Sequence, residues 1–513
     1  MSLISKFLTI SGFTAISRIL GVVREAVFSH FLGASVEMDA FLIAYRFPGF
    51  FRKFFAEGGF QSIFSPYYAD FLSNSKRNGG RYFSSRVFTI ILGFVFFVTC
   101  LVLIFAKQFV LLMAPGFAND TAKLSLAIEF TRVIFPSISF LSLSSVYSAI
   151  LMMHKKFFYY SLPPILVNLV LISSLCMGQR LMTAGWRVSI GYFIAGVLQF
   201  LYLYLCLKHL RLTIPVFSSF KITSRTKEFF KKLIPVLAGA GVAQINIFVG
   251  SLFGSFLPTG GISCLYFADR FIQFPLALFG ISIGVVLLPE IAINITRREY
   301  IKDTINKSIL FAMRLTFPSI VILSSLSYLF ISLLYGHGQF SDISVQKTAN
   351  VLKLSSLGLP AYVTAKIISS VLFAEKDSKT PVAAGCVSIV ANAVLSIILI
   401  KPFQELGIAF ATAVSGFINV YIMLKQSKIQ LFSNKEFIKG LFKIFIASVI
   451  LLLCIEWLKE TFCIDRYDIV YKILAIAMVI TIGMVVYAWI LYWLNDTSVK
   501  KGFKIVKCWI LKR

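Results

Sequence analysis

The chain has 513 residues, of which 58% are hydrophobic and only 14% are charged, and its formal net charge is +28. Soluble domains carry about a quarter charged residues, so this composition excludes an ordinary soluble protein. The positive charge would suit a nucleic-acid partner, but the basic residues collect in loops between apolar runs, as they do in membrane proteins. We therefore predict an all-α polytopic membrane protein that does not bind nucleic acid.

Apolar runs long enough to cross a hydrocarbon core of about 30 Å recur along the whole chain. We predict fourteen transmembrane helices. They lie near residues 6–31, 38–72, 86–113, 123–152, 158–178, 186–208, 233–256, 262–295, 305–335, 345–374, 381–400, 406–425, 437–459 and 468–494. The first run lacks a small-residue cleavage site and contains arginines, so we expect a retained helix rather than a signal peptide.

Loops rich in Lys and Arg alternate with loops that hold almost none. The basic loops are 76–86, 155–156, 208–232, 297–307, 376–379, 425–443 and the tail from 500. Positive loops stay on the cytoplasmic side, so both termini are predicted to be cytoplasmic.

The eight cysteines show no spacing typical of a metal site, and we expect neither a metal nor a cofactor. Cys454 and Cys463 are the one pair that we considered for a disulfide, at the outer face. The role of the last two helices is left open.

Short patterns recur at an offset of 223 or 224 residues. "AYRF" at 44–47 matches "ADRF" at 268–271, and Pro66 matches Pro289. The repeat predicts two six-helix lobes related by a parallel pseudo-twofold axis, an architecture of transporters that bind substrate between the lobes. The predicted parts are an N-lobe (1–210), a basic amphipathic connector (211–232), a C-lobe (233–430) and a C-terminal part (431–513) with two helices and a basic tail.

Charged residues interrupt the first, second and eighth predicted helices. The basic ones are Arg18, Arg24, Arg46, Arg52, Lys53 and Arg270, and the acidic ones are Glu25, Asp39, Glu57 and Asp269. An arginine near the bilayer centre costs about 2.5–3.5 kcal/mol unless it faces a wet cavity lined by protein. Snorkelling or internal ion pairs are the alternative, above all for Arg46, Lys53 and Asp269. The surplus of positive charge predicts an anion site, and the guanidinium fork suits phosphate oxygens.

The two arginines of "SRILGVVRE" at 17–25 do not share a face of an ideal helix, because they are six residues apart. Arg18 and Arg24 can therefore act together only through a helix bend or neighbouring helices.

Four segments carry a resemblance to a known family: "SRILGVVRE", "GASVEMDAFLIAYRFPGFFRKFFAEGGFQSIFSPYYADF", "MAPGF" and "DSKTP". They resemble the MurJ/MviN lipid II flippases of the MOP exporter superfamily, in order over residues 1–430. The resemblance implies a MATE-like fold of fourteen helices in the bacterial inner membrane. It also implies that the protein moves undecaprenyl-pyrophosphate-linked disaccharide-pentapeptide to the periplasmic leaflet by alternating access, for peptidoglycan synthesis.

The resemblance also implies binding residues and partners. The family's functional residues fall here on Arg18, Arg24, Asp39, Arg52, Glu57 and Arg270, with Ser17, Lys53, Asn168 and Ser263 near the cavity. The expected partners are lipid II and membrane lipids, with cell-wall synthesis proteins as further candidates, and the expected state is a monomer. The lipid tail would stay in the bilayer, along the last two helices. Membrane potential and ion coupling both stay open as energy sources.

Three other functions would require different sequence features or fit the same ones. A MATE-type multidrug or cation antiporter would concentrate acidic residues in its cavity, whereas the excess here is basic. A flippase for another polyprenyl-pyrophosphate glycan fits the charges equally well. An enzyme is not expected, because the four histidines (His30, His154, His209 and His337) lie at helix ends or loops without partner carboxylates.

Overall fold

The computed structural model describes residues 3–56, 59–73, 77–214, 223–293, 298–375, 377–426, 435–462, 469–496 and 500, and these form helices and no strand. Each of the fourteen predicted segments falls on helix. Nine helices of the described part are long and apolar enough to cross a membrane, or ten if the pair α16–α17, bent by 48°, is one span. α1 and α2, which carry Arg18, Arg24 and Arg52, are not among the nine. The all-helical membrane fold is thus confirmed, and the count of fourteen crossings stays a prediction.

The chain divides into two compact units, Met1–Ser263 with Gly338–Phe340, and Cys264–His337 with Ser341–Arg513. The helices of the first unit are α1 (Leu3–Leu32), α2 (Val36–Ala56), α3 (Gly59–Ser73), α4 (Arg77–Ile104), α5 (Ala106–Met113), α6 (Thr121–Ile134), α7 (Ser137–Met153), α8 (Phe157–Ser161), α9 (Pro163–Cys176), α10 (Ala184–His209) and α11 (Ser224–Gly254), with a 3₁₀ turn at Pro115–Asn119. Those of the second are α12 (Gly261–Pro275), a π-helical segment (Leu276–Ile281), α13 (Ser282–Ile293), α14 (Arg298–Ser325), α15 (Ser327–Tyr335), α16 (Asp342–Ser356), α17 (Leu359–Ala374), α18 (Lys379–Gln426), α19 (Lys435–Phe462) and α20 (Ile469–Trp493); α12 begins within the first unit.

Proline explains two of the breaks within predicted spans. The run 262–295 changes to π-helix directly after Pro275, because proline has no N–H to donate and its ring crowds the preceding turn. In α18, Gln404 has non-helical backbone angles (φ 47°, ψ −126°) two residues after Pro402. This break separates the two helices that the sequence predicts at 381–400 and 406–425.

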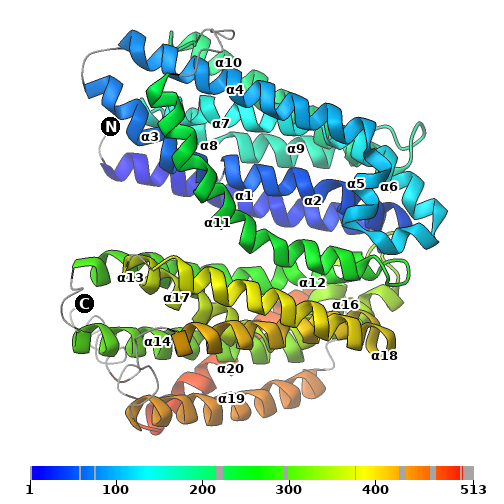
Figure 1. The fold of residues 1–513 in the computed structure, drawn as a ribbon. Helices are drawn as coiled ribbons and strands as arrows, with labels where there is room; N and C mark the ends of the chain where they lie inside the picture. The colour runs from blue at the N-terminus through cyan, green and yellow to red at the C-terminus, as the bar shows by residue number, and fades with distance from the viewer. Residues whose placement is uncertain are drawn as a thin grey trace. The chain divides into compact units, whose positions relative to one another are not determined.

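α11 packs against helices of the first unit (Figure 1), and aromatic side chains form part of this contact. Phe229 of α11 is fully buried, with ring centroids 5.9 Å from Phe60 of α3 and 5.8 Å from Phe83 of α4. Buried aromatic pairs of this kind stabilise beyond their buried area. The compact units thus divide after α11, whereas the sequence repeat divides before it; the repeat-based domain boundaries stay a prediction.

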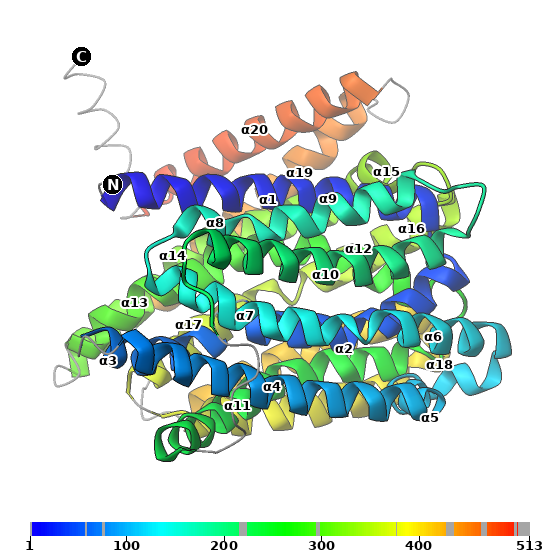
Figure 2. The same cartoon turned by 90° about the horizontal axis from the view of Figure 1, so that it is seen from above.

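The last two helices lie side by side (Figure 2), and both pack against α14 in the second unit. Ile444, Leu451 and Val479 are fully buried in that core. Arg314 of α14 donates to Asp496, just after α20, with Nη2–Oδ2 at 2.8 Å and Nε–Oδ2 at 3.0 Å. Both side chains are largely buried, so this ion pair fixes the end of α20 to α14.

The "DSKTP" segment begins α18. Asp377 accepts hydrogen bonds from the Lys379 N–H (3.0 Å), the Thr380 N–H (3.1 Å) and the Thr380 hydroxyl (2.6 Å). The hydrogen bond from the Thr380 hydroxyl is the main cause that lowers the pKa of Asp377 below its ordinary value. Asp377 therefore caps the N-terminus of α18.

Replacing Arg314 with Ala is expected to lower the free energy of unfolding by about 3–5 kcal/mol, because it leaves the buried Asp496 carboxylate without its arginine. Lys459→Ala serves as the control, because it removes a more exposed ion pair with Glu456 and should cost at most about 1 kcal/mol. Denaturant titration in mixed micelles measures both. Equal losses would contradict the structural role of the Arg314–Asp496 pair.

Replacing Asp377 with Ala is expected to cost about 1 kcal/mol of unfolding free energy at neutral pH. Because the folded-state pKa of Asp377 is lowered, the stabilisation is complete above the ordinary pKa of 3.8 and disappears as the pH falls through the folded-state pKa. Unfolding of wild type and variant, measured from neutral pH to well below 3.8, should converge in acid. A difference that persists unchanged would show that the carboxylate charge has no part in the cap.

Candidate functional site

Three of the predicted site residues meet where α1 packs on α9. Arg24 Nη1 donates to Asn168 Oδ1 at 2.9 Å, and Asn168 Nδ2 donates to the Ser17 carbonyl at 3.1 Å. Arg24 Nη2 forms an ion pair with the buried Glu25 carboxylate. Asn168 and Glu25 thus hold the Arg24 guanidinium from two sides. These two contacts fix the orientation of the guanidinium plane within the first unit.

A second arginine joins this group through a tyrosine. The Tyr192 hydroxyl of α10 is buried and has no hydrogen-bond partner among the described residues. It interacts electrostatically with both Arg24 and Arg52, and its ring meets Tyr45 edge-on at 5.1 Å. We call Arg24, Glu25, Arg52, Asn168 and Tyr192 the arginine cluster. It combines two guanidinium groups with one carboxylate, so its net charge suits an anion.

Sequence reasoning missed Tyr192 as a member of this cluster. A tyrosine within an apolar run looks the same whether it faces lipid or a buried arginine. Only the packing of α10 against α1 and α2 distinguishes the two cases.

Arg18 differs from Arg24 in its exposure. It is exposed on α1, whereas the side chain of Arg24 is only 14% exposed. This agrees with the expectation that the two arginines do not share a helix face.

Asp39 belongs to a different, fully buried group. Its Oδ1 accepts from the Ser263 N–H (3.0 Å) and hydroxyl (2.6 Å), and its Oδ2 accepts from the Gly260 N–H at 2.8 Å. Lys123 Nζ of α6 lies 3.8 Å from Oδ2. Asp39 thus ties α2 to α6 and to the turn before α12. Its burial gives Asp39 and Ser263 a structural task, and their contact with substrate stays a prediction.

The other predicted residues are placed individually. Arg270 lies on α12 in the second unit, stacked over the Tyr266 ring at 4.4 Å and 3.9 Å from Asp269 Oδ2. Glu57 lies outside the described residues, as does the side chain of Lys53, and so does Cys463 of the considered disulfide. In the described part of the chain, no group of three or more His, Cys, Asp or Glu side chains could hold a metal ion.

Comparison with known proteins identifies the family. The family model "Lipid II flippase MurJ" matches residues 28–470. The chain belongs to this family. A protein named "Probable lipid II flippase MurJ" from Rhizobium tropici is 35% identical over 428 residues, covering 82% of this chain and 80% of that one. A relative with the same name from Buchnera aphidicola subsp. Baizongia pistaciae (strain Bp) is 31% identical over 490 residues, covering 92% and 93%.

Solved structures agree with this assignment. The structure titled "Lipid II flippase MurJ, inward closed conformation" matches with a TM-score of 0.77 and 28% identity over 94% of this chain and 99% of that chain. An inward-facing multidrug resistance MATE family transporter of the MOP superfamily matches with a TM-score of 0.64 and 13% identity over 84% and 95%. The second likeness shows a shared fold alone. The MurJ family is one of transporters, which settles that the protein is not an enzyme.

Replacing Asp39 with Ala is expected to lower the free energy of unfolding by about 3–5 kcal/mol, because it removes the buried one of the two carboxylates that face the Lys123 ammonium and leaves the Ser263 hydroxyl without its acceptor. Asp120→Ala is the matched control, since Asp120 also faces Lys123 (4.0 Å) but is 41% exposed and caps α6, which is worth about 1 kcal/mol. Unfolding in mixed micelles measures both variants. If Asp39→Ala cost no more than Asp120→Ala, Asp39 would not have the structural task described here.

Proposed function

We propose that the protein flips lipid II from the cytoplasmic to the periplasmic leaflet of the bacterial inner membrane, where it serves peptidoglycan synthesis. Membership in the MurJ family supports this substrate. The observation that carries the proposal is the arginine cluster, because it sets two guanidinium groups and a tyrosine hydroxyl inside a membrane-embedded unit. These are the donors that a lipid-linked pyrophosphate needs.

In the proposed cycle the pyrophosphate binds Arg24 and Arg52, and the Tyr192 hydroxyl donates to it. Asn168 keeps one arm of the Arg24 fork in place, so little side-chain freedom is lost when the anion arrives. Glu25 competes with the phosphate for the other arm. This competition weakens binding enough to allow release, as transport requires.

The proposal also includes charged residues outside the arginine cluster, the membrane orientation and the oligomeric state. Arg18 and Arg270 are further candidates for contact with the phosphates, and Lys53 and Glu57 are candidates on α2 and directly after it. The basic loops support cytoplasmic termini. We propose a monomer that uses no cofactor or metal and changes between states of alternating access.

Complementation of a strain depleted of its own flippase tests the function. Wild type should restore growth, and Arg24→Ala should fail because the pyrophosphate loses a charge-assisted contact whose removal weakens binding about tenfold or more. Arg225→Ala removes an exposed arginine of α11 and is the matched control, which should restore growth.

Immunoblots of membranes must show all three proteins at equal amounts. If inserted wild type fails to restore growth, the flippase assignment is contradicted. If Arg24→Ala restores growth as well as Arg225→Ala, the role of Arg24 is contradicted while the flippase assignment stands.

A further inference from the structure

The second unit carries a lysine in the middle of an apolar helix. Lys366 lies within α17, where its neighbours Val363 and Ile367 are buried, whereas Lys366 itself is exposed. An ammonium group within a membrane span is costly, and such groups almost always face the bundle interior or a water-filled cavity. Neither charge nor resemblance singled out Lys366 in the sequence, so its surroundings must indicate its role.

One face of α17 packs along the π-helical segment and α13. Tyr362, Lys366 and Ser370 are spaced four residues apart on α17 and therefore share a helix face. A methyl group at Gly280 would lie 3.5 Å from Lys366 Cβ, and one at Gly284 would lie 2.6 Å from Ser370 Oγ. The two glycines thus let the helices approach closely, and this packing fixes where the Lys366 side chain leaves α17.

The same seam between helices is polar along α12. Tyr362 interacts electrostatically with Asp269, whose side chain is 51% exposed. Gln273, one turn further along α12, is exposed and donates to Asp269 Oδ2. Exposed aspartate, glutamine and lysine residues along one seam indicate that it faces a water-filled cavity rather than lipid. We call Asp269, Arg270, Gln273, Tyr362 and Lys366 the polar seam.

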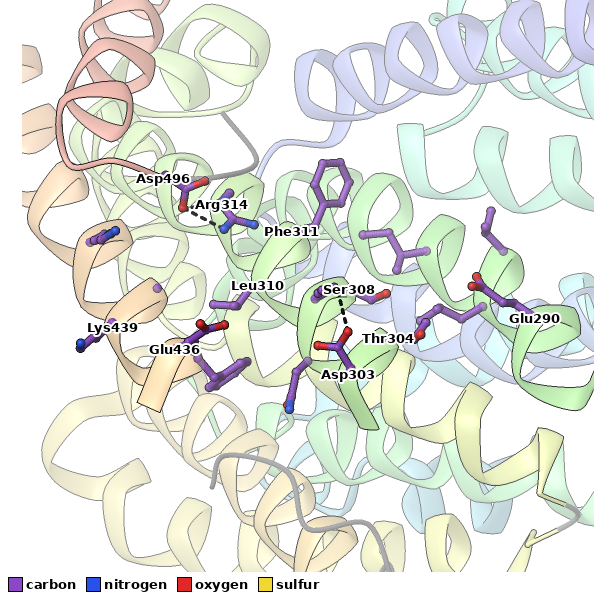
Figure 3. Close-up of a pocket in the computed structure, with 18 of the residues that line it drawn as sticks. Glu290, Asp303, Thr304, Ser308, Leu310, Phe311, Arg314, Glu436, Lys439 and Asp496 are labelled. Carbon is purple, nitrogen blue, oxygen red and sulfur yellow. Dashed lines mark hydrogen bonds and ion pairs between the residues drawn. The ribbon is translucent and has the colours of Figure 1, made fainter. Parts of the chain in front are cut away.

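A large pocket elsewhere in the second unit differs from the polar seam in its charges. It has a volume of about 1120 Å³ and is lined mainly by α13, α14, the start of α19 and the residues after α20 (Figure 3). Its four basic and four acidic side chains balance formally, and Arg314 is already paired with Asp496, as Lys307 is with Asp303. The polar seam instead combines two cations with one carboxylate, so it suits an anionic group better than the pocket does.

We propose that the polar seam binds the terminal carboxylate of the substrate's pentapeptide, with Lys366 as the cation that contacts it. This inference rests on the proposed function, which supplies a headgroup with a disaccharide and a pentapeptide. The carboxylate accepts from the Lys366 ammonium, and a peptide N–H donates to the exposed Asp269 carboxylate. A lysine suits this task, because its compact ammonium binds one carboxylate without the two-point geometry that a guanidinium favours.

Other parts of the proposed substrate fit the polar seam less well. A pyrophosphate offers only acceptors, so it brings no donor for Asp269. The sugars offer hydroxyl groups but no negative charge for Lys366. The end of a peptide supplies both an anion and N–H donors, and it is therefore the part of the headgroup that satisfies both charged residues.

Binding of the purified full chain to two forms of lipid II tests the proposal. One form keeps the free terminal carboxylate of the pentapeptide, and the other carries a carboxamide there. Wild type should bind the carboxylate form about tenfold more tightly, as expected for one hydrogen bond between charged groups. Lys366→Gln should bind both forms equally, and Lys366→Arg should keep the preference because it retains the charge. Lys459→Gln, near the end of α19, is the matched control and should show the preference of wild type.

The outcomes separate this inference from the proposed function. Equal affinity of wild type for the two forms, or a full preference that survives in Lys366→Gln, would overturn the inference while lipid II binding still supports the proposed function. If wild type bound neither form, the proposed function would be contradicted and the inference with it. If Lys366→Gln lost affinity equally for both forms, Lys366 would contact another part of the headgroup and the inference would also fail. Thermal unfolding in detergent should show Lys366→Gln to be as stable as wild type, because the glycine contacts of α17 do not involve the ammonium.

Discussion

An arginine inside a bilayer needs protein groups that accept its hydrogen bonds and offset its charge. Arg24 is the clearest example among the described residues of this chain. Transfer of a guanidinium into hydrocarbon costs several kcal/mol, and Asn168 and Glu25 offset that cost from two sides. To place these partners, α9 must pack directly on α1. The proposed function uses the same arrangement, since we propose that this oriented cation binds an anionic headgroup.

Three groups of buried charges are paired by protein side chains or backbone, but the pairing has different consequences in each. Asp39 has its oxygens occupied by two backbone N–H groups, one hydroxyl and a nearby ammonium, and Arg314 is taken up by Asp496. These two groups hold helices together. Among the described residues, the arginine cluster combines two guanidinium groups with one carboxylate and a tyrosine hydroxyl for which the structure shows no hydrogen-bond partner. The excess of cationic donors makes this cluster the candidate binding site.

Sequence patterns predicted the helices well because apolar runs and prolines act locally. Charge singled out Arg24, the resemblance singled out Ser17 and Asn168, and the structure brings the three residues together. Tertiary packing was not predictable: Lys123 of α6 and the Gly260 N–H of the turn before α12 are far from Asp39 in the sequence, yet they contact its carboxylate in a buried group. Asn168 and Asn392 are also 224 residues apart, which is the offset of the sequence repeat, but Asn168 accepts from an arginine, whereas Asn392 accepts from Ser396 at 3.4 Å. No sequence pattern indicated a role for Tyr192, because its hydroxyl becomes a candidate binding group only through its position near Arg24 and Arg52.

The central claim is that Arg24 recognises the pyrophosphate of the substrate, and a double-mutant cycle tests it most directly. Wild type and Arg24→Ala would each be titrated with lipid II and with an analogue that carries a single phosphate in place of the pyrophosphate. If Arg24 contacts the pyrophosphate, removing the second phosphate weakens binding to wild type about tenfold more than binding to Arg24→Ala, a coupling of about 1.4 kcal/mol. Equal losses in both proteins would show that Arg24 does not interact with the pyrophosphate and would contradict the account.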